Sequence, residues 1–174
     1  MRVVAGKYKG KKIESPSSSN IRPTGDKVKQ ALFTKLQFFV EDKIVLDLFS
    51  GSGSLGIEAL SRGAKKVYFC DKDKRSILLT KNNLKGINDD FVIIPKQYNI
   101  ALDCIKEKID LILIDPPYNE GLYNDALKII YDNKILSDDG IIVCEHLNEE
   151  EIITDFKCFD KKRYGTVTLS YFEY

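Results

Sequence analysis

Histidine and long apolar runs are scarce or missing in this chain of 174 residues, and each absence excludes a class of protein. A single histidine, His146, cannot build a histidine-rich metal centre, and the four cysteines show neither a CxxC pair nor zinc-type spacing. No apolar run approaches the roughly 20 residues that a membrane-spanning helix needs, and residues 1–6 do not resemble a signal peptide. We therefore predict a cytoplasmic protein with reduced thiols, no metal and no membrane segment.

An excess of one charge sign is also missing, because 27 basic and 26 acidic residues give a net charge of +1. The two signs are unevenly distributed, however. Residues 1–40 hold nine basic and two acidic residues, a net charge of +7, which leaves the remainder with 18 basic and 24 acidic residues, a net charge of −6. Such an asymmetry is typical of a basic arm that contacts a polyanion. A lysine-rich surface that is only solvated would have the same composition, so the charge alone leaves both interpretations open.

The chain divides into an N-terminal extension, residues 1–40, and an α/β domain, residues 41–174. In the extension we predict a short β-hairpin, a polar serine-rich loop and an amphipathic helix that is capped by Thr24 or Asp26. The whole chain is 43% hydrophobic, which is enough for one domain of this length to bury a substantial core.

Strands and helices alternate after residue 41, and the strands are short and rich in Val and Ile, as is typical of strands covered on both faces. The expected strands are 44–49, 66–70, 91–95, 109–114 and 140–145, and the expected helices lie near 54–62, 73–85, 98–107 and 121–135. Residues 156–159 and 165–172 predict a terminal antiparallel hairpin, and His146 is predicted at the surface or at a cap. The expected fold is a doubly wound, mostly parallel α/β sheet, which binds ligands outside the carboxyl ends of its strands.

A glycine loop closes the first expected strand and opens a helix. It contains G-x-G-x-x-G at Gly51, Gly53 and Gly56, and Asp71 follows at the end of the second strand. Glycines at this place let the backbone approach a ligand closely, and the acid can accept hydrogen bonds from ribose hydroxyls. The pattern therefore predicts a nucleoside ligand, although a tight strand-to-helix turn that binds nothing would also use glycines.

Asp47 decides which nucleoside ligand fits this loop. In a dinucleotide site the loop faces a pyrophosphate, which a carboxylate just before the glycines would repel. S-adenosylmethionine instead offers a cationic ammonium group to Asp47 and ribose hydroxyls to Asp71. These residues favour S-adenosylmethionine over a nicotinamide cofactor, and the latter stays as an alternative.

A second motif, Asp115-Pro116-Pro117-Tyr118, closes the fourth expected strand at the same sheet edge. An exocyclic base amine is a poor nucleophile, because its lone pair is delocalised into the ring. A carboxylate on Asp115 and the carbonyl oxygen of Pro116 could accept both of its N–H bonds, while the two prolines fix the backbone. Tyr118 could stack on a flipped base. The alternative is a purely structural role, in which the motif is a rigid Pro-Pro turn with Asp115 as a cap.

Together the two motifs resemble those of the amino-methyltransferases, which methylate an exocyclic nitrogen of a base or a glutamine amide. The segments Arg2-Val3-Val4-Ala5-Gly6 and Arg22-Pro23-Thr24 further resemble the opening of the RsmD family, bacterial methyltransferases that modify N2 of a guanine in small-subunit ribosomal RNA. Tyr164-Gly165 near the C-terminus is also similar to that family. The resemblance spans essentially the whole chain and implies a Rossmann-like S-adenosylmethionine-dependent methyltransferase fold.

The resemblance also implies roles for particular residues. The expected catalytic residues are Asp115, Pro116, Pro117 and Tyr118. The expected cofactor contacts are Asp47, Phe49, Ser50, Gly51, Gly53, Asp71, Lys72 and Gln97. The expected RNA contacts are Arg2, Lys7, Tyr8, Lys9, Lys11, Arg22, Pro23 and Thr24, because cations on an arm can bind phosphates. Small-subunit ribosomal RNA is the expected partner, free or within the subunit, and we expect a monomer.

Two other functions are compatible with these motifs. An adenine-N6 DNA methyltransferase could use the same Asp-Pro-Pro-Tyr motif, although the chain has no separate domain for DNA recognition. A non-catalytic RNA-binding protein could retain the fold, although such a protein would be expected to lose Asp115 or the glycines.

Overall fold

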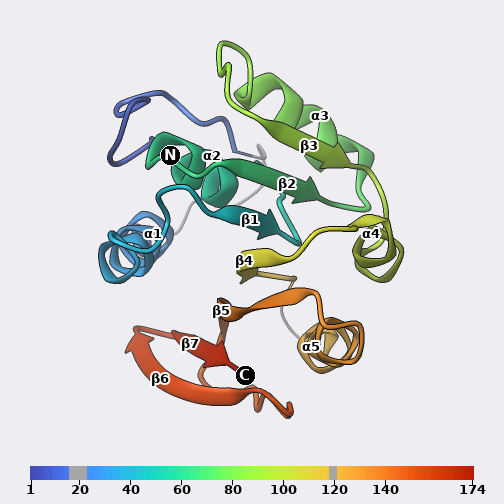
Figure 1. Cartoon of the computed structure of the whole chain (residues 1–174). Coiled ribbons are helices and arrows are strands. Elements are labelled where there is room, and N and C mark those ends of the chain that lie inside the picture. The colour runs from blue at the N-terminus through green and yellow to red at the C-terminus, as the bar shows by residue number, and fades with distance from the viewer. Residues whose placement is uncertain (16–22, 118–120) are drawn as a thin grey trace.

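The computed structural model describes residues 1–15, 23–117 and 121–174, and helices and strands alternate along most of this length (Figure 1). In chain order the elements are α1 (Pro23–Lys35), β1 (Ile44–Asp47), α2 (Ser54–Ser61), β2 (Lys66–Cys70), α3 (Lys74–Asn83), β3 (Phe91–Ile94), α4 (Tyr98–Cys104), β4 (Ile109–Ile114), α5 (Leu122–Asp132), β5 (Leu136–Leu147), β6 (Lys157–Tyr164) and β7 (Val167–Glu173). The predicted alternation of strands and helices is therefore confirmed.

The strands form one seven-stranded sheet in the order β3-β2-β1-β4-β5-β7-β6. The strands from β3 to β5 in this order run parallel, and β7 pairs antiparallel with both β5 and β6. The chain winds outward in both directions from the neighbouring pair β1 and β4, so their carboxyl ends lie at a topological switch point. The doubly wound, mostly parallel sheet with a C-terminal antiparallel hairpin is confirmed.

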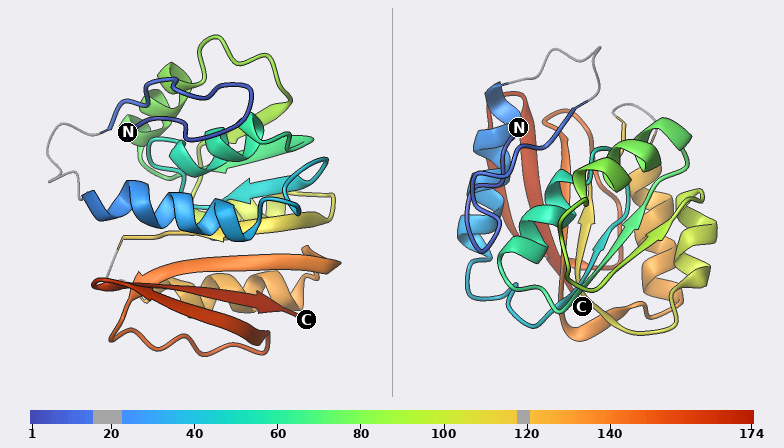
Figure 2. Two further views of the ribbon diagram at one scale, coloured as in Figure 1. Left: turned by 90° about the vertical axis from the view of Figure 1, so that its left-hand side faces the viewer. Right: turned by 90° about the horizontal axis from the view of Figure 1, so that it is seen from above.

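Two hydrophobic layers cover the two faces of this sheet (Figure 2). Val45 and Leu46 are adjacent in β1 and point to opposite faces, as successive residues of a strand do. Helices α1 and α2 pack on the face of Val45, and α4 and α5 pack on the face of Leu46. Within the described ranges, no helix has the length and apolar character needed to cross a bilayer.

The N-terminal extension shares the core of the α/β domain. Val3 and Ile13 from its first segment, and Phe33 from α1, belong to the same buried cluster as Val45. The predicted β-hairpin is reduced to a turn with one isolated antiparallel bridge, between Arg2 and Lys12. The pairing across the turn is limited to a few backbone hydrogen bonds near Val3 and Ile13, because the following N–H groups, from Val4 to Tyr8, donate mostly to Glu58 and Ser61 of α2.

Glu58 on α2 is the main attachment point for that segment. Its side chain is fully buried and accepts hydrogen bonds from the backbone N–H groups of Val4, at 2.8 Å, and Ala5, at 3.1 Å. Arg62 donates to the same carboxylate at 2.8 Å, so this buried charge is paired. The basic segment is thereby fixed next to the helix that follows the glycine loop.

The prediction that His146 lies at the surface or at a cap is wrong. His146 is 2% exposed rather than at the surface, and its Nε2 lies 2.8 Å from the hydroxyl oxygen of Ser170. The reason is that β5 continues to Leu147 and pairs there with Val167 of β7. Burial lowers the pKa of the imidazole, which keeps the ring neutral.

Candidate functional site

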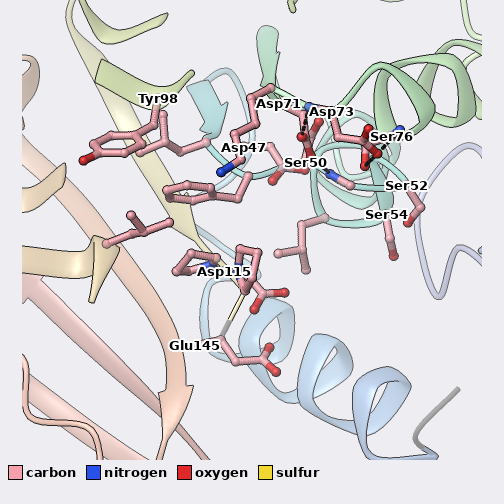
Figure 3. A pocket seen from close by; sticks show the side chains of 18 of the residues that line it. Asp47, Ser50, Ser52, Ser54, Asp71, Asp73, Ser76, Tyr98, Asp115 and Glu145 are labelled. Carbon is pink, nitrogen blue, oxygen red and sulfur yellow. Dashed lines mark hydrogen bonds between the residues drawn. The ribbon is translucent and has the colours of Figure 1, made fainter. Parts of the chain in front are cut away.

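A cavity of about 740 Å³ opens at the carboxyl ends of the parallel strands. Asp47 is the last residue of β1, Asp115 follows β4, and Glu145 lies near the end of β5; all three line the cavity (Figure 3). The size is in the range of pockets that bind small molecules and cofactors. The sheet thus brings the two predicted motifs to one place.

The glycine loop is built for a tight turn and for close packing. Gly53 caps α2 with a φ of 77°, a left-handed conformation that favours glycine. Gly56 packs against the ring of Phe69, and a Cβ atom at this position would come within 2.3 Å of that ring. Gly51 lines the cavity, whereas Gly53 does not. Gly53 is therefore needed for the shape of the loop.

Asp47 lies under the loop and is 2% exposed. Its carboxylate accepts a hydrogen bond from the N–H of Gly56 at 2.9 Å. Burial raises the pKa of Asp47 to about 7, against the opposing effect of this hydrogen bond, and the negative charge of Asp71 raises it further. A cation bound beside Asp47 would favour its ionised form.

Asp71 connects the glycine loop to the end of β2. One carboxylate oxygen accepts a hydrogen bond from the N–H of Gly51 at 2.9 Å, and the other accepts from the N–H of Asp73 at 2.8 Å. The loop also holds Ser50, whose buried hydroxyl has no hydrogen-bond partner among the residues that the structure describes. A buried polar atom of this kind is costly unless a ligand satisfies it, so the cavity fits a polar ligand here.

The remaining predicted cofactor contacts form a wall and a rim. Phe49 stacks at an angle on Tyr98, with ring centroids 5.7 Å apart, and both line the cavity. Lys72 and Gln97 are exposed at its edge. This side of the cavity is therefore aromatic within and polar at the mouth.

Asp115 and both prolines line the opposite side of the cavity. Burial raises the pKa of Asp115 well above its ordinary value, and the negative charges of Glu145 and Asp47 raise it further. Pro116 is buried and Pro117 is exposed. Tyr118, the fourth residue of the predicted motif, lies outside the described residues.

Four charged residues of the cavity were not predicted from the sequence, namely Lys29, Asp73, Lys96 and Glu145. Glu145 was predicted only as the end of a strand, although an acid at the carboxyl end of a central parallel strand is a signal for the site. Lys29 is 3% exposed and lines the cavity from α1. Its ammonium group donates to the carbonyl oxygen of Arg2 at 2.8 Å and to Ser54 at 3.2 Å. The sequence around Lys29 does not indicate a place in the site, because Lys27 and Lys29 alternate there as surface lysines commonly do.

Several predicted RNA contacts already have partners within the protein. Lys7 forms an ion pair with Asp89, and Lys11 donates to the carbonyl oxygen of Lys85 at 2.7 Å. Lys9 is exposed.

Four further predicted contacts belong to the same segment or to α1, and a fifth lies outside the described residues. Arg2 donates to the carbonyl oxygen of Gly10 at 2.9 Å, and the Tyr8 hydroxyl accepts from the N–H of Asn88 at 3.4 Å. Arg22 lies outside the described residues, and residues 23 and 24 form the start of α1. The role of this segment in RNA binding stays a prediction.

Comparison with known proteins supports the methyltransferase interpretation of the chain. The family model described as "Conserved hypothetical protein 95" matches residues 1–173. The Haemophilus influenzae protein named "Ribosomal RNA small subunit methyltransferase D" is 35% identical over 159 residues, which cover 88% of this chain and 82% of that protein. The Escherichia coli protein of the same name is 34% identical over 151 residues, covering 83% and 74%.

A solved structure shows the same fold. It is that of the Escherichia coli protein yhhF, whose name as a methyltransferase is provisional. The two structures superpose with a TM-score of 0.86 and 27% identity, over 99% of this chain and 96% of that one. The described sheet and its helices are therefore a Rossmann-like methyltransferase fold.

Proposed function

The chain belongs to the family described as Conserved hypothetical protein 95, and on this premise we propose that it is a ribosomal RNA methyltransferase. This membership confirms the resemblance to the RsmD family that the sequence indicated. In full, the proposed reaction is transfer of a methyl group from S-adenosylmethionine to the exocyclic N2 amine of a guanine in small-subunit ribosomal RNA. The proposed enzyme is a cytoplasmic monomer.

The glycine-loop side of the cavity suits the methyl donor. S-adenosylmethionine, when bound, supplies an electrophilic methyl group on a sulfonium. In the proposal Asp47 pairs with its ammonium group, Asp71 accepts hydrogen bonds from its ribose, and the Ser50 hydroxyl gains a partner. Phe49 and Tyr98 supply apolar surface and exclude water.

The Asp-Pro-Pro side suits the target amine. The carboxylate of Asp115 and the carbonyl oxygen of Pro116 accept the two N–H bonds, which directs the nitrogen lone pair away from both acceptors and into the cavity. The amine becomes strongly acidic once it carries a fourth substituent, and Asp115 then accepts its proton. Because burial and Glu145 raise the pKa of Asp115, its carboxylate is a better proton acceptor than an exposed one.

One observation carries the proposal. Asp115 and Gly51, which belong to motifs 64 residues apart in the chain, line the same cavity at the switch point of the sheet. Alignment of an amine with a methyl donor, and electrostatic stabilisation of the charge that develops, account for most of the rate enhancement that such a site can give. In the proposal the stacking role of Tyr118 and the phosphate contacts of the N-terminal extension position the RNA.

The test is incubation of the protein with labelled S-adenosylmethionine and three substrates: free ribosomal RNA, small subunits and DNA. Digestion to nucleosides and mass analysis then identify the product. We expect N2-methylguanosine from RNA, and the more reactive of the two RNA substrates identifies the natural one. Methylated adenine in DNA, with unlabelled RNA, would favour the DNA methyltransferase instead.

A further inference from the structure

Glu145 occupies a place in the cavity that the proposed reaction does not yet use. Ile114 of β4 is paired with Cys144 of β5, so Asp115 and Glu145 are each the next residue along two adjacent parallel strands. Both line the cavity, and Figure 3 shows their carboxyl groups beside each other and pointing to the same side of the strand ends. The charge of Glu145 is felt by Asp115, since it raises the pKa of that carboxyl group.

The backbone holds Glu145 firmly in this position. Its carbonyl oxygen accepts a hydrogen bond from the Tyr123 hydroxyl at 2.8 Å, and Tyr123 is itself buried in α5. On its other side Glu145 is in register with Leu169 of β7. The backbone of Glu145 is therefore fixed at a point where the residue lines the cavity.

Two neighbouring carboxylates repel each other, and the repulsion is relieved either by a proton on one of them or by N–H donors that lie between them. The Watson–Crick edge of guanine presents such donors side by side, namely the N2 amine and the N1–H. Adenine and cytosine present an amine next to a ring nitrogen that only accepts hydrogen bonds. A carboxylate facing that ring nitrogen would oppose its lone pair.

We propose that the carboxylate of Glu145 accepts a hydrogen bond from the N1–H of the target guanine and so selects guanine over other bases that carry an exocyclic amine. This inference rests on the proposed function and names what determines the choice of base at its site. Asp115 and Pro116 hold the reacting amine, whereas Glu145 identifies the base beside it. A site that hydrogen-bonds one substrate group discriminates against analogues that lack it, because that hydrogen bond is then lost.

The test uses 2-aminopurine, which keeps the C2 amine of guanine but has an unprotonated N1. We place it at the nucleotide that is methylated in ribosomal RNA, and measure kcat/KM for the guanine and 2-aminopurine substrates. The wild-type protein should prefer guanine by about tenfold to a hundredfold, the scale of one hydrogen bond to a charged group. Glu145→Gln should bring this preference close to one, because an amide can donate to the unprotonated N1 as well as accept from N1–H.

Intrinsic differences between the two bases cancel when the wild-type and variant preferences are divided. Glu149→Gln is the matched control, since it removes an exposed carboxylate from the same segment outside the cavity. Glu145→Asp keeps the charge and should keep part of the guanine preference. Thermal unfolding and binding of S-adenosylhomocysteine show whether each variant is intact.

The possible outcomes separate the two proposals. An unchanged preference in Glu145→Gln, with the wild-type protein active on guanine, would overturn only the role of Glu145. A wild-type protein that methylates no guanine in ribosomal RNA would overturn both. If Glu145→Gln does not fold, the Glu145→Asp preference decides, and a value equal to that of the wild type would count against the inference.

Discussion

The carboxyl groups on the two sides of the cavity have different surroundings. On the glycine-loop side, Asp47 accepts a hydrogen bond from Gly56, and Asp71 accepts from two backbone N–H groups. On the Asp-Pro-Pro side, Asp115 lies beside a second carboxylate, Glu145, and its pKa is raised by burial and by that charge. Hydrogen bonds between loop and strand ends thus fix the first side, whereas the second brings two carboxyl groups together where an amine would bind.

This difference indicates that the two sides of the cavity have different roles in binding. A side fixed by its own backbone is preorganised for a ligand that binds in every cycle. A side with two adjacent carboxyl groups is selective, because it favours a ligand that brings N–H donors. Four variants test whether the two sides differ in this way.

Replacing Asp115 should have the largest effect. Asp115→Ala removes one of the two acceptors for the amine, and we expect kcat to fall by about 10²- to 10³-fold, the scale of a lost stabilising group. Binding of S-adenosylhomocysteine, measured by calorimetry, should persist because the other side of the cavity is untouched. Asp103→Ala, an exposed acid on α4, is the control, and turnover at the wild-type rate in Asp115→Ala would remove this residue from the mechanism.

The raised pKa of Asp47, about 7, predicts a pH dependence of donor binding. A ligand ammonium group needs the ionised carboxylate, so the affinity for S-adenosylhomocysteine should rise up to about tenfold per pH unit below that pKa and level off above it. Calorimetric titrations from about pH 5.5 to about pH 8.5 measure this. Asp47→Asn should weaken binding and remove the dependence, and a wild-type affinity that is flat over the range would contradict the pairing.

The same carboxyl group affects stability with a definite sign. Its pKa is higher in the folded than in the unfolded protein, so the folded state holds more protons between the two values. The free energy of unfolding of the ligand-free protein should therefore fall as pH rises from about 4 to about 7, and this contribution should not change further above that. Denaturant titrations of the wild type and Asp47→Asn separate it from other groups.

Ser50→Ala should have opposite effects on stability and on binding. The substitution removes a buried hydroxyl without a partner among the described residues, so the free energy of unfolding of the ligand-free protein should rise by about 1 kcal/mol. The affinity for S-adenosylhomocysteine should fall by about fivefold, because a hydrogen bond to the ligand is lost. An unchanged affinity would show that this hydroxyl does not contact the donor.

The smallest effect is expected outside the cavity. Lys9 is exposed, whereas Lys7 is paired with Asp89, so Lys9→Glu should weaken RNA binding several-fold and reduce its salt slope by about one. Lys106→Glu is the control, because Lys106 precedes β4 and lies at the amino ends of the strands. Equal salt slopes for the two variants would exclude a phosphate contact at Lys9.

Much of the fold could be predicted from the sequence, because short Val- and Ile-rich strands and intervening helices give a strong local pattern. The ends of β5 could not, since its extension to Leu147 depends on pairing with β7. The burial of His146 follows from the same distant pairing. The N-terminal hairpin is shorter than predicted for a related reason: the N–H groups of Val4 and Ala5 donate to Glu58, which is 54 residues away from Val4, and not across the hairpin.

Site residues could be predicted where they belong to a short motif that follows a predicted strand, as Gly51 and Asp115 do. Glu145 and Lys29 were missed because neither belongs to a motif, and only the three-dimensional fold brings them to the cavity. The sequence likewise could not indicate that Lys7 is engaged with Asp89, on a loop far along the chain.

The central claim is that the methyl donor and the target amine share the cavity between Gly51 and Asp115. A crystal structure with S-adenosylhomocysteine bound tests it most directly. We expect the ligand ammonium to lie against Asp47 and the ribose against Asp71. The sulfur should face Asp115 and Pro116, with room for one amine between them. A ligand seated elsewhere, or a sulfur turned away from Asp115, would contradict it.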